Sequence, residues 1–186
     1  MSGADIQMEF PELFRLLYHG SDSRFSAIDL SKSALKKDFG CGFYTTNSKD
    51  QAEKFARLKA KRSGLSKGFV EVFRFCDTEG LKIKKHDSAD EEWFDFVLQN
   101  RGHIELASKG ELGRFDIVIG PVANDAVGLV LNQYISGAFG DPFSTEAKAT
   151  AIRLLLTQTL SNQVFFGTDL AVSSLSFVEV YDVLLD

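Results

Sequence analysis

The chain has 186 residues, 44% of them hydrophobic and 25% charged, with a formal net charge of -5 at pH 7. This composition argues against a disordered chain and predicts one globular domain over residues 1–186, large enough to bury a core without disulfides or metals. The acidic balance argues against a nucleic acid as the main partner, because a phosphate backbone attracts basic surfaces. Cys41 and Cys76 form no spaced cluster with the histidines, so neither a zinc site nor a disulfide scaffold is expected.

The N-terminal residues show no targeting signal. Residues 1–7 lack a basic segment followed by an apolar one, so a secretory signal is not expected. No stretch approaches the roughly 20 apolar residues that span a bilayer. We therefore expect a cytoplasmic protein without a membrane partner, while delivery into another cell by non-classical secretion stays open.

The first third of the chain predicts a strand, a loop, a second strand and a helix. Residues 13–19 form an apolar run that the turn formers at residues 20–23 end, and residues 43–46 form an aromatic and β-branched run. Asn47 or Ser48 can then cap a helix. The apolar positions of this helix are Ala52, Phe55, Ala56 and Leu58.

The middle of the chain predicts a hairpin and a helix. Residues 68–75 alternate as a half-buried strand does, and residues 81–84 are expected to pair with it across the turn at residues 77–80. Residues 89–101 carry apolar side chains at helical spacing, with Ser88 as the predicted cap.

The last third predicts three strands and three helices. Ser144 is the expected cap of the second of these helices. Strands and helices do not alternate regularly, and no Gly-x-Gly-x-x-Gly follows a strand, so an α+β fold with a mixed or antiparallel sheet is predicted. The predicted elements are a strand at residues 115–121, helices at residues 124–135 and 144–160, a strand at residues 163–167, a short helix near Ala171 and a strand at residues 177–183.

Three polar positions lie beside glycines or at strand ends. His19 enters a turn at Gly20, whose backbone could clamp an amide, although a strand-end histidine bonded to a carbonyl is an open alternative. Tyr44 could offer its ring to a flat heterocycle or lie in the core. Gln163 could hold a ribose hydroxyl or simply begin an exposed strand.

Together these segments resemble a bacterial domain-of-unknown-function family that looks related to the ADP-ribosyltransferase superfamily. The resemblance runs from about residue 18 to residue 177. The motifs that carry it are Tyr-His-Gly-Ser at residues 18–21, Asp-Phe-Gly-Cys-Gly-Phe-Tyr-Thr-Thr at 38–46 with Gln-Ala at 51–52, Asp-Ile-Val-Ile-Gly-Pro-Val-Ala-Asn-Asp at 116–125, and Asn-Gln-Val-Phe-Phe at 162–166.

The resemblance implies a split, mostly antiparallel sheet with flanking helices that grips NAD as a co-substrate. It implies His19, Tyr44 and Gln163 as catalytic residues, with His19 on the adenosine-side ribose and Tyr44 stacked on nicotinamide. The Gly20 backbone would clamp the nicotinamide amide. The residues expected to contact NAD are His19, Gly20, Ser21, Asp38, Gly42, Tyr44 and Arg101.

The implied function is NAD-dependent mono-ADP-ribosyl transfer to an unknown acceptor, a protein rather than a nucleic acid. Gln163 stands where many such transferases have a glutamate, and a carboxylate stabilises the positive charge that develops on the ribose better than an amide does. The alternative is therefore a weak or inactive module that binds NAD or a protein. Glu179 could supply the missing charge, or it could be an edge-strand charge in water.

Weaker candidates remain. Asn100 and Arg101, at a helix end, could reach a diphosphate or simply face solvent. A third function class is a cysteine hydrolase that pairs Cys41 with a histidine. The histidines that could serve it are His19, His86 and His103, and the lysines that could assist a diphosphate, or only form a wet surface, are Lys32, Lys36 and Lys37.

Overall fold

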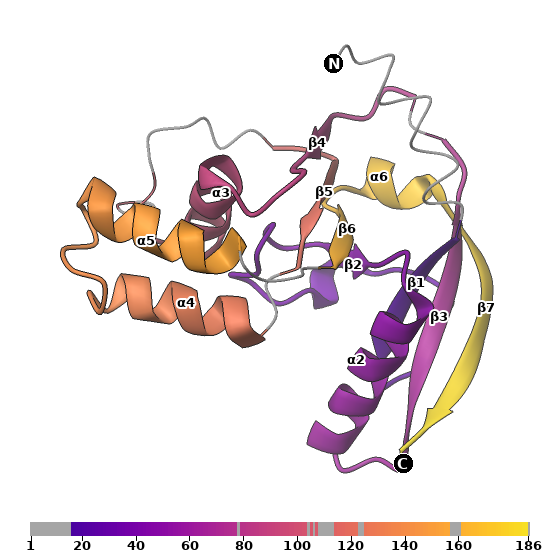
Figure 1. Cartoon of the computed structure of the whole chain (residues 1–186). Helices are drawn as coiled ribbons and strands as arrows, with labels where there is room; N and C mark the ends of the chain where they lie inside the picture. The colour runs from indigo at the N-terminus through magenta and orange to yellow at the C-terminus, as the bar shows by residue number, and fades with distance from the viewer. Residues whose placement is uncertain are drawn as a thin grey trace.

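The computed structural model describes residues 16–185, except residues 78, 104, 106, 108–113, 123, 124 and 157–160. It is a mixed α+β structure in which two mostly antiparallel sheets are flanked by helices (Figure 1). The predicted fold class, a split and mostly antiparallel sheet with flanking helices, is confirmed. Residues 1–7 and 13–15, the start of the helix predicted from residue 124 and the end of the helix predicted to residue 160 lie outside the described residues.

A three-stranded sheet has the order β1-β3-β7, with β1 at Leu16–Ser21, β3 at Lys67–Phe75 and β7 at Leu175–Leu184. This order makes β3 the central strand and places β7 at one edge, and both pairings are antiparallel. The register places His19 directly opposite Glu71. Residues opposite each other share one face of a sheet, so this pair points to the same side.

A four-stranded sheet has the order β2-β6-β5-β4. Its strands are β2 at Phe43–Thr45, β6 at Asn162–Phe166, β5 at Ile117–Pro121 and β4 at Ile83–Lys85. The pairs β2–β6 and β5–β6 are antiparallel, whereas β4 and β5 run parallel.

The hairpin predicted between residues 68–75 and 81–84 is wrong. Strand β3 is already paired along both edges, with β1 and with β7, so it has no free edge for a third partner. The segment instead joins the other sheet, where the Lys82 N–H donates to the Asp116 carboxylate (2.8 Å) and the Asp116 N–H donates to the Lys82 carbonyl (2.9 Å).

In the part of the chain that the structure describes, the backbones of the two sheets are joined at one isolated bridge. Tyr18 of β1 and Thr46 exchange both backbone hydrogen bonds, at 2.8 and 2.9 Å, and this isolated bridge is antiparallel. On either side of it β1 continues along β3 and β2 continues along β6. The split in the sheet therefore opens next to His19 and Gly20.

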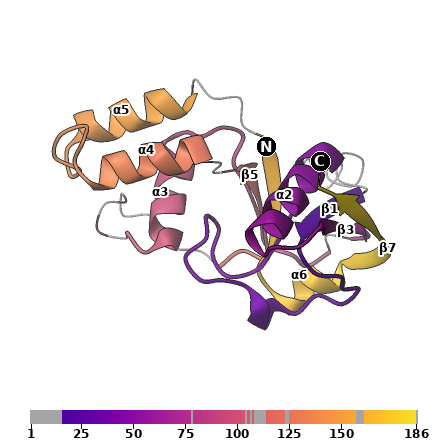
Figure 2. The same cartoon turned by 90° about the horizontal axis from the view of Figure 1, so that it is seen from below.

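In the described residues, five helices flank the sheets: α2 at Lys49–Arg62, α3 at Glu91–Arg101, α4 at Asp125–Ile135, α5 at Thr145–Leu156 and α6 at Asp169–Ser173. A short 3-10 turn, η1, spans Leu30–Lys32. Figures 1 and 2 show α3, α4 and α5 together beside the four-stranded sheet, and α2 against β1 and β3. No helix in the described part of the chain is both long and apolar enough to cross a membrane.

Side-chain caps explain where several helices begin. Ser48 accepts from the Gln51 N–H and Ser144 accepts from the Ala147 N–H, which confirms both predicted caps. The cap of α3 is Asp90 rather than Ser88, because Asp90 Oδ1 accepts from the Trp93 N–H (3.0 Å).

Helix α2 packs on the sheet through small residues. Its buried positions are Ala52, Ala56 and Ala60, whereas Phe55 and Leu58, two of the apolar positions identified in the sequence, are 46% and 37% exposed. A side chain on the facing Gly20 would place its Cβ 2.2 Å from the Ala52 carbonyl oxygen. The helix lies so close to the strand that large side chains fit only on its outer side.

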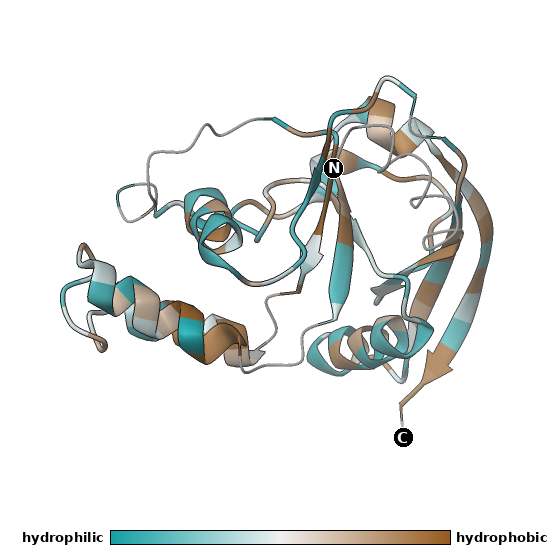
Figure 3. Ribbon diagram, turned by 45° about the horizontal axis from the view of Figure 1, so that its top comes forward, coloured by the Kyte–Doolittle hydropathy of each residue, from teal (hydrophilic) through white to brown (hydrophobic). Residues whose placement is uncertain are grey.

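The core divides into an outer layer, an inner layer and the α2 interface. The outer layer joins the four-stranded sheet to α3, α4 and α5 and contains Trp93, Phe165 and Tyr134, while the inner layer lies between the sheets and contains Phe43 and Phe73. Hydrophobic positions run along the strands that border these layers, and polar residues alternate with apolar ones along α2 (Figure 3).

Candidate functional site

Tyr44 and Gln163 lie on one face of two neighbouring strands. Tyr44 of β2 is paired with Phe165 of β6, and Gln163 is two residues from Phe165 on the same strand. Because side chains alternate along a strand, Tyr44, Phe165 and Gln163 all point to the face that α3 covers. The structure therefore brings these two sequence-predicted residues together.

The Gln163 side chain is almost fully buried and its amide orientation is fixed. Nε2 lies 3.3 Å from Asp38 Oδ2 and 3.4 Å from the Pro121 carbonyl oxygen, and the side chain is 7% exposed. Exchanging the amide nitrogen and oxygen would place Oε1 against two other oxygens. The network therefore assigns both N–H groups to these partners and keeps Oε1 as an acceptor.

Asp38 links Gln163 to the end of helix α3. Arg101, the last residue of α3, donates from Nε (2.9 Å) and Nη2 (2.7 Å) to Asp38 Oδ1. Asp38 is itself only 9% exposed. A short chain of contacts thus runs from Arg101 through Asp38 to Gln163, and the predicted diphosphate ligand Arg101 is engaged by this carboxylate.

The Tyr44 hydroxyl holds the loop that precedes β2. It donates to the Gly40 carbonyl (2.7 Å) and accepts from the Phe39 N–H (3.0 Å). Burial raises the pKa of this phenol well above its usual range. The Lys37 ammonium lies over the ring, 4.9 Å from its centroid, as a cation–π contact. The ring is half-buried: it packs against Phe165 and is in contact with Lys37.

Gly40 and Gly42 of this loop lie where a side chain would be crowded by neighbouring residues. Gly40 adopts a φ of +99°, which favours glycine, and a Cβ on it would lie 3.1 Å from Asn100 Oδ1. A Cβ on Gly42 would lie 2.3 Å from the Phe165 ring, and both backbone groups of Gly42 bond to Ser33 Oγ. Gly42, predicted to contact NAD, therefore serves the loop itself in this structure.

His19 caps a carbonyl at the point where the sheets part. Its Nδ1 lies 2.6 Å from the Tyr44 carbonyl oxygen, and its ring stacks on Phe43 at a centroid distance of 4.7 Å. Burial lowers the pKa of His19 to about 4, so the ring is neutral at physiological pH. A neutral ring that donates from Nδ1 to a carbonyl keeps Nε2 as an acceptor.

The His19 and Tyr44 rings lie on different sides of β2. Phe43, on which the His19 ring stacks, belongs to the inner core layer, whereas Tyr44 packs with the outer one. Consecutive side chains of a strand point to opposite faces. The structure joins His19 to Tyr44 only through the Tyr44 carbonyl, so the predicted set divides into two groups along the edge of β2.

The backbone of Gly20 faces the split between the sheets. In an antiparallel strand, the N–H and C=O groups of successive residues point alternately to the two neighbouring strands. The backbone groups of Gly20, two residues after Tyr18, therefore point to the same side as those of Tyr18. Continuing the Tyr18–Thr46 register would pair Gly20 with Tyr44, but the pairing stops and His19 Nδ1 takes the Tyr44 carbonyl instead. Within the described residues, no side chain or loop backbone hydrogen-bonds to Gly20 on that side.

A buried carboxyl beside His19 is a residue that sequence reasoning missed. Glu71 is 0% exposed, its Oε1 lies 3.1 Å from Ser21 Oγ, and its Oε2 has no hydrogen-bond partner among the residues that the structure describes. Burial raises the pKa of Glu71 to about 7. The alternating pattern of residues 68–75 is typical of a strand with one face in water. Glu71 instead lies on the face of β3 that carries Phe73, which the inner core layer covers. Ser21, predicted to contact NAD, is a partner of this carboxyl.

The other acidic and basic candidates lie at the surface. Glu179 is exposed on the edge strand β7, as the alternative interpretation predicted, and faces solvent rather than Gln163. Lys32 and Lys36 are exposed. Asn100 donates from Nδ2 to the Phe96 carbonyl within its own helix (2.8 Å).

The residues of the cysteine-hydrolase alternative do not come together. Cys41 is exposed and its Sγ lies 3.6 Å from the Ser33 carbonyl oxygen, while His19 is bonded to Tyr44. His86 is buried in the core against Phe96. Among the residues that the structure describes, no cysteine–histidine contact is found, and no three His, Cys, Asp or Glu side chains gather as a metal site needs.

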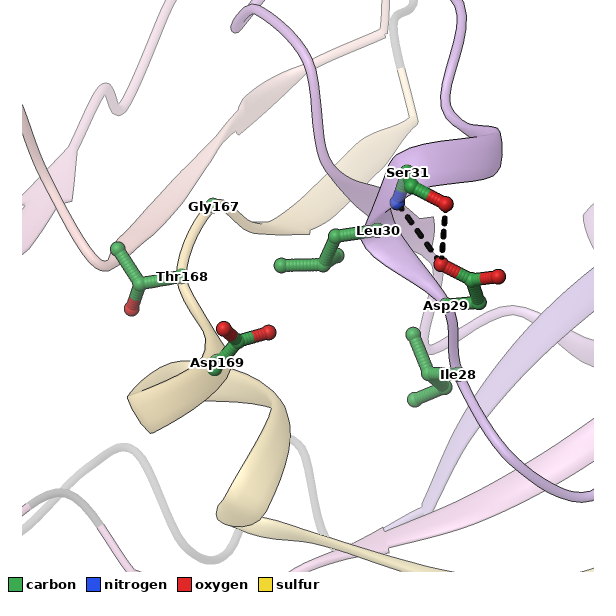
Figure 4. A pocket seen from close by; sticks show the side chains of 7 residues that line it. All are labelled: Ile28, Asp29, Leu30, Ser31, Gly167, Thr168 and Asp169. Atoms are coloured by element: carbon green, nitrogen blue, oxygen red, sulfur yellow. Dashed lines mark hydrogen bonds between the residues drawn. The ribbon is translucent and has the colours of Figure 1, made fainter.

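A separate open pocket of about 620 Å³ lies where β6 ends (Figure 4). Its wall on one side runs from Gly167 to Asp169, at the start of α6, and on the other from Ile28 to Ser31. Asp29 there accepts hydrogen bonds from the N–H and hydroxyl of Ser31. Two carboxylates and no basic side chain line this pocket, so it does not suit an anionic dinucleotide.

Comparison with known proteins gives a family. No curated protein matches the chain. A family model matches residues 16–177, which span β1 to the first residues of β7 and include His19, Tyr44 and Gln163. The chain therefore belongs to the family described as "Protein of unknown function (DUF3990)".

Proposed function

We propose that the protein is an NAD-dependent mono-ADP-ribosyltransferase that transfers ADP-ribose to a protein acceptor and releases nicotinamide. The observation that supports this most is the backbone of Gly20, whose N–H and C=O face the split between the sheets without a partner from the described residues on that side. A primary carboxamide carries one acceptor and one donor side by side. Nicotinamide therefore complements this pair in chemistry and spacing.

Tyr44 is the residue that the interrupted register would place opposite Gly20, so its ring lies beside the proposed amide site. The Lys37 ammonium over the ring shows that this ring attracts a cation. The nicotinamide ring of NAD is itself a cation and flat. In the proposed complex it replaces the exposed Lys37 side chain on the Tyr44 ring.

Two side chains can each accept a hydrogen bond from a ribose hydroxyl of NAD. Gln163 keeps Oε1 as an acceptor and neutral His19 keeps Nε2, and the two lie on different sides of β2. NAD is elongated and has two riboses, so one molecule along the edge of β2 can meet both. In this arrangement Gln163 binds the nicotinamide ribose and His19 binds the adenosine ribose.

The chemistry is a substitution at C1′ of the nicotinamide ribose. The acceptor nucleophile forms a bond to C1′ while the bond from C1′ to the pyridinium nitrogen breaks. The bonding electron pair stays on the nitrogen, so nicotinamide leaves as a neutral molecule, and the proton of the nucleophile passes to water. Positive charge develops on the ribose on the way, and Gln163 Oε1 is the nearby partial negative charge.

The test has two readouts. The purified chain is incubated with NAD and nicotinamide release is followed by chromatography, and labelled NAD is added with a cell extract to detect a labelled protein. His19→Ala and Tyr44→Ala should abolish both signals, while Glu179→Gln, an exposed edge-strand residue, should leave them unchanged. Neither NAD consumption nor label transfer at high protein concentration contradicts the proposal.

A specific observation favours the alternative of a binding module. Position 163 carries an amide that the surrounding oxygens hold in place, so no carboxylate belongs to this strand position. Under this alternative the chain binds NAD, or a protein partner, without turning NAD over. Calorimetric titration separates the two functions, because heat of NAD binding without nicotinamide release supports the module and turnover excludes it.

A further inference from the structure

The structure places a negative charge directly behind the Gln163 amide. Asp38 Oδ2 lies 3.3 Å from Gln163 Nε2, and Asp38 is 9% exposed. Resting on the proposed function, we propose that Asp38 is a positioning residue: it fixes the Gln163 amide with Oε1 toward the ribose and supplies, through that amide, the negative potential that a glutamate would carry.

The orientation follows from the donors and acceptors. A free glutamine side chain can present either end of its amide to a ligand. Here Asp38 and the Pro121 carbonyl offer only acceptors to Gln163, so its N–H groups turn to them and its oxygen turns away. An oxygen that faces the ribose accepts from a hydroxyl and attracts the developing positive charge. A nitrogen in that place would repel it.

The charge acts through a polarised amide. A hydrogen bond from Nε2 to a carboxylate draws electron density toward Oε1, and this effect is strong where water is absent. Both Gln163 and Asp38 are buried, so water does not screen the interaction. Arg101 neutralises part of the Asp38 charge, but it binds Oδ1, the other oxygen of that carboxylate.

The arrangement predicts that the carboxylate and the amide can be exchanged between positions 38 and 163. Asp38→Asn removes the charge and lets the position 38 side chain donate to Gln163 as well as accept from it. Gln163→Glu places two carboxylates against each other, which raises the pKa of one of them. In the double variant, the asparagine amide at position 38 donates to the glutamate carboxylate at position 163, and the pair keeps one negative charge and one hydrogen bond. Arg101 keeps an oxygen acceptor at position 38.

The experiment measures kcat and KM for nicotinamide release together with the Kd of NAD by calorimetry. Asp38→Asn should lower kcat by about 100-fold, the loss typical of one electrostatic stabiliser, with little change in Kd. The double variant should recover kcat to within about tenfold of the wild type. Asp95→Asn is the matched control, because Asp95 is an equally buried aspartate whose cation, Lys148, comes from α5 (2.7 Å).

Each outcome is decisive. An Asp38→Asn variant that keeps the wild-type kcat overturns the positioning role while the proposed function stands. If that variant does not fold, the folded double variant decides, and a kcat more than about tenfold below the wild type overturns the inference. A wild-type protein that binds NAD without turnover overturns both the inference and the transferase, and supports the binding module. A wild-type protein that neither binds nor consumes NAD refutes the proposed function itself.

Discussion

The buried carboxyl of Glu71 should make the protein lose stability as the pH rises. Burial raises the pKa of Glu71 from the usual 4.5 to about 7, because the ionised form has lost its contact with water. The Ser21 hydroxyl has one proton for two acceptors, the Ser23 carbonyl (2.5 Å) and Glu71 Oε1 (3.1 Å), and within the described part of the chain no donor reaches Glu71 Oε2. The folded state therefore prefers the protonated carboxyl.

The magnitude follows from the two pKa values. Below 4.5 the group is protonated in both the folded and the unfolded chain and costs nothing. Between 4.5 and about 7 the unfolded chain gives up the proton and the folded chain keeps it, so the free energy of unfolding falls with rising pH. At about 1.4 kcal/mol per pH unit, the full loss is about 3 kcal/mol.

Glu71→Gln removes this loss while keeping the shape of the protonated side chain. Urea unfolding should give the variant nearly wild-type stability at about pH 5 and a free energy of unfolding higher by up to about 3 kcal/mol at about pH 8. The control is Glu179→Gln, the same change at an exposed position of β7, which should be neutral at both pH values. A difference between Glu71→Gln and wild type that is the same at both pH values would refute the reasoning.

Three further outcomes test the geometry of the split. Gly20→Ala should destabilise the fold by about 1–3 kcal/mol in urea unfolding, because its Cβ would lie 2.2 Å from the Ala52 carbonyl oxygen, whereas Gly128→Ala, with open space around it, should not. The contribution of His19 to stability should fall as the pH drops from 6.5 toward about 4, because folded His19 resists protonation; since Glu71 acts in the opposite direction over this range, the measure is the melting temperature of His19→Gln minus that of wild type, which should rise as the pH falls. Tyr44→Phe, which loses two hydrogen bonds to the preceding loop, should cost about 1–3 kcal/mol by the same unfolding assay; an unchanged stability would show that the loop does not depend on them.

Local signals in the sequence were sufficient for most of the elements. Capping side chains such as Ser48 and Ser144 satisfy the free N–H groups of a first helical turn, and they do so whatever the helix later packs against. Apolar runs such as residues 164–166 predict a buried strand whatever it later pairs with. The motifs likewise brought Tyr44, Gln163 and Asp38 into the candidate set before any geometry was known, and the position of Arg101 at a predicted helix end added that residue.

The sequence could not say which strands pair or which faces become core. The segment at residues 81–84 pairs with β5 rather than β3 because both edges of β3 are occupied, and occupancy of an edge depends on strands more than 90 residues away, such as β7. Phe55 and Leu58 lie outside because α2 approaches Gly20 closely, which only the packed sheet imposes.

What the sequence by itself determined is the α+β class, the helix starts and the residues that carry the candidate chemistry, because these depend on periodicity, caps and residue type. Only the tertiary structure decided that His19 and the Tyr44 ring lie on different sides of β2, that Gly20 faces a split, and that a carboxylate stands behind Gln163. It also buried Glu71, by covering the face of β3 on which Glu71 lies with the inner core layer. Burial and hydrogen-bond direction arise from contacts between segments distant in the chain, and no local pattern encodes them.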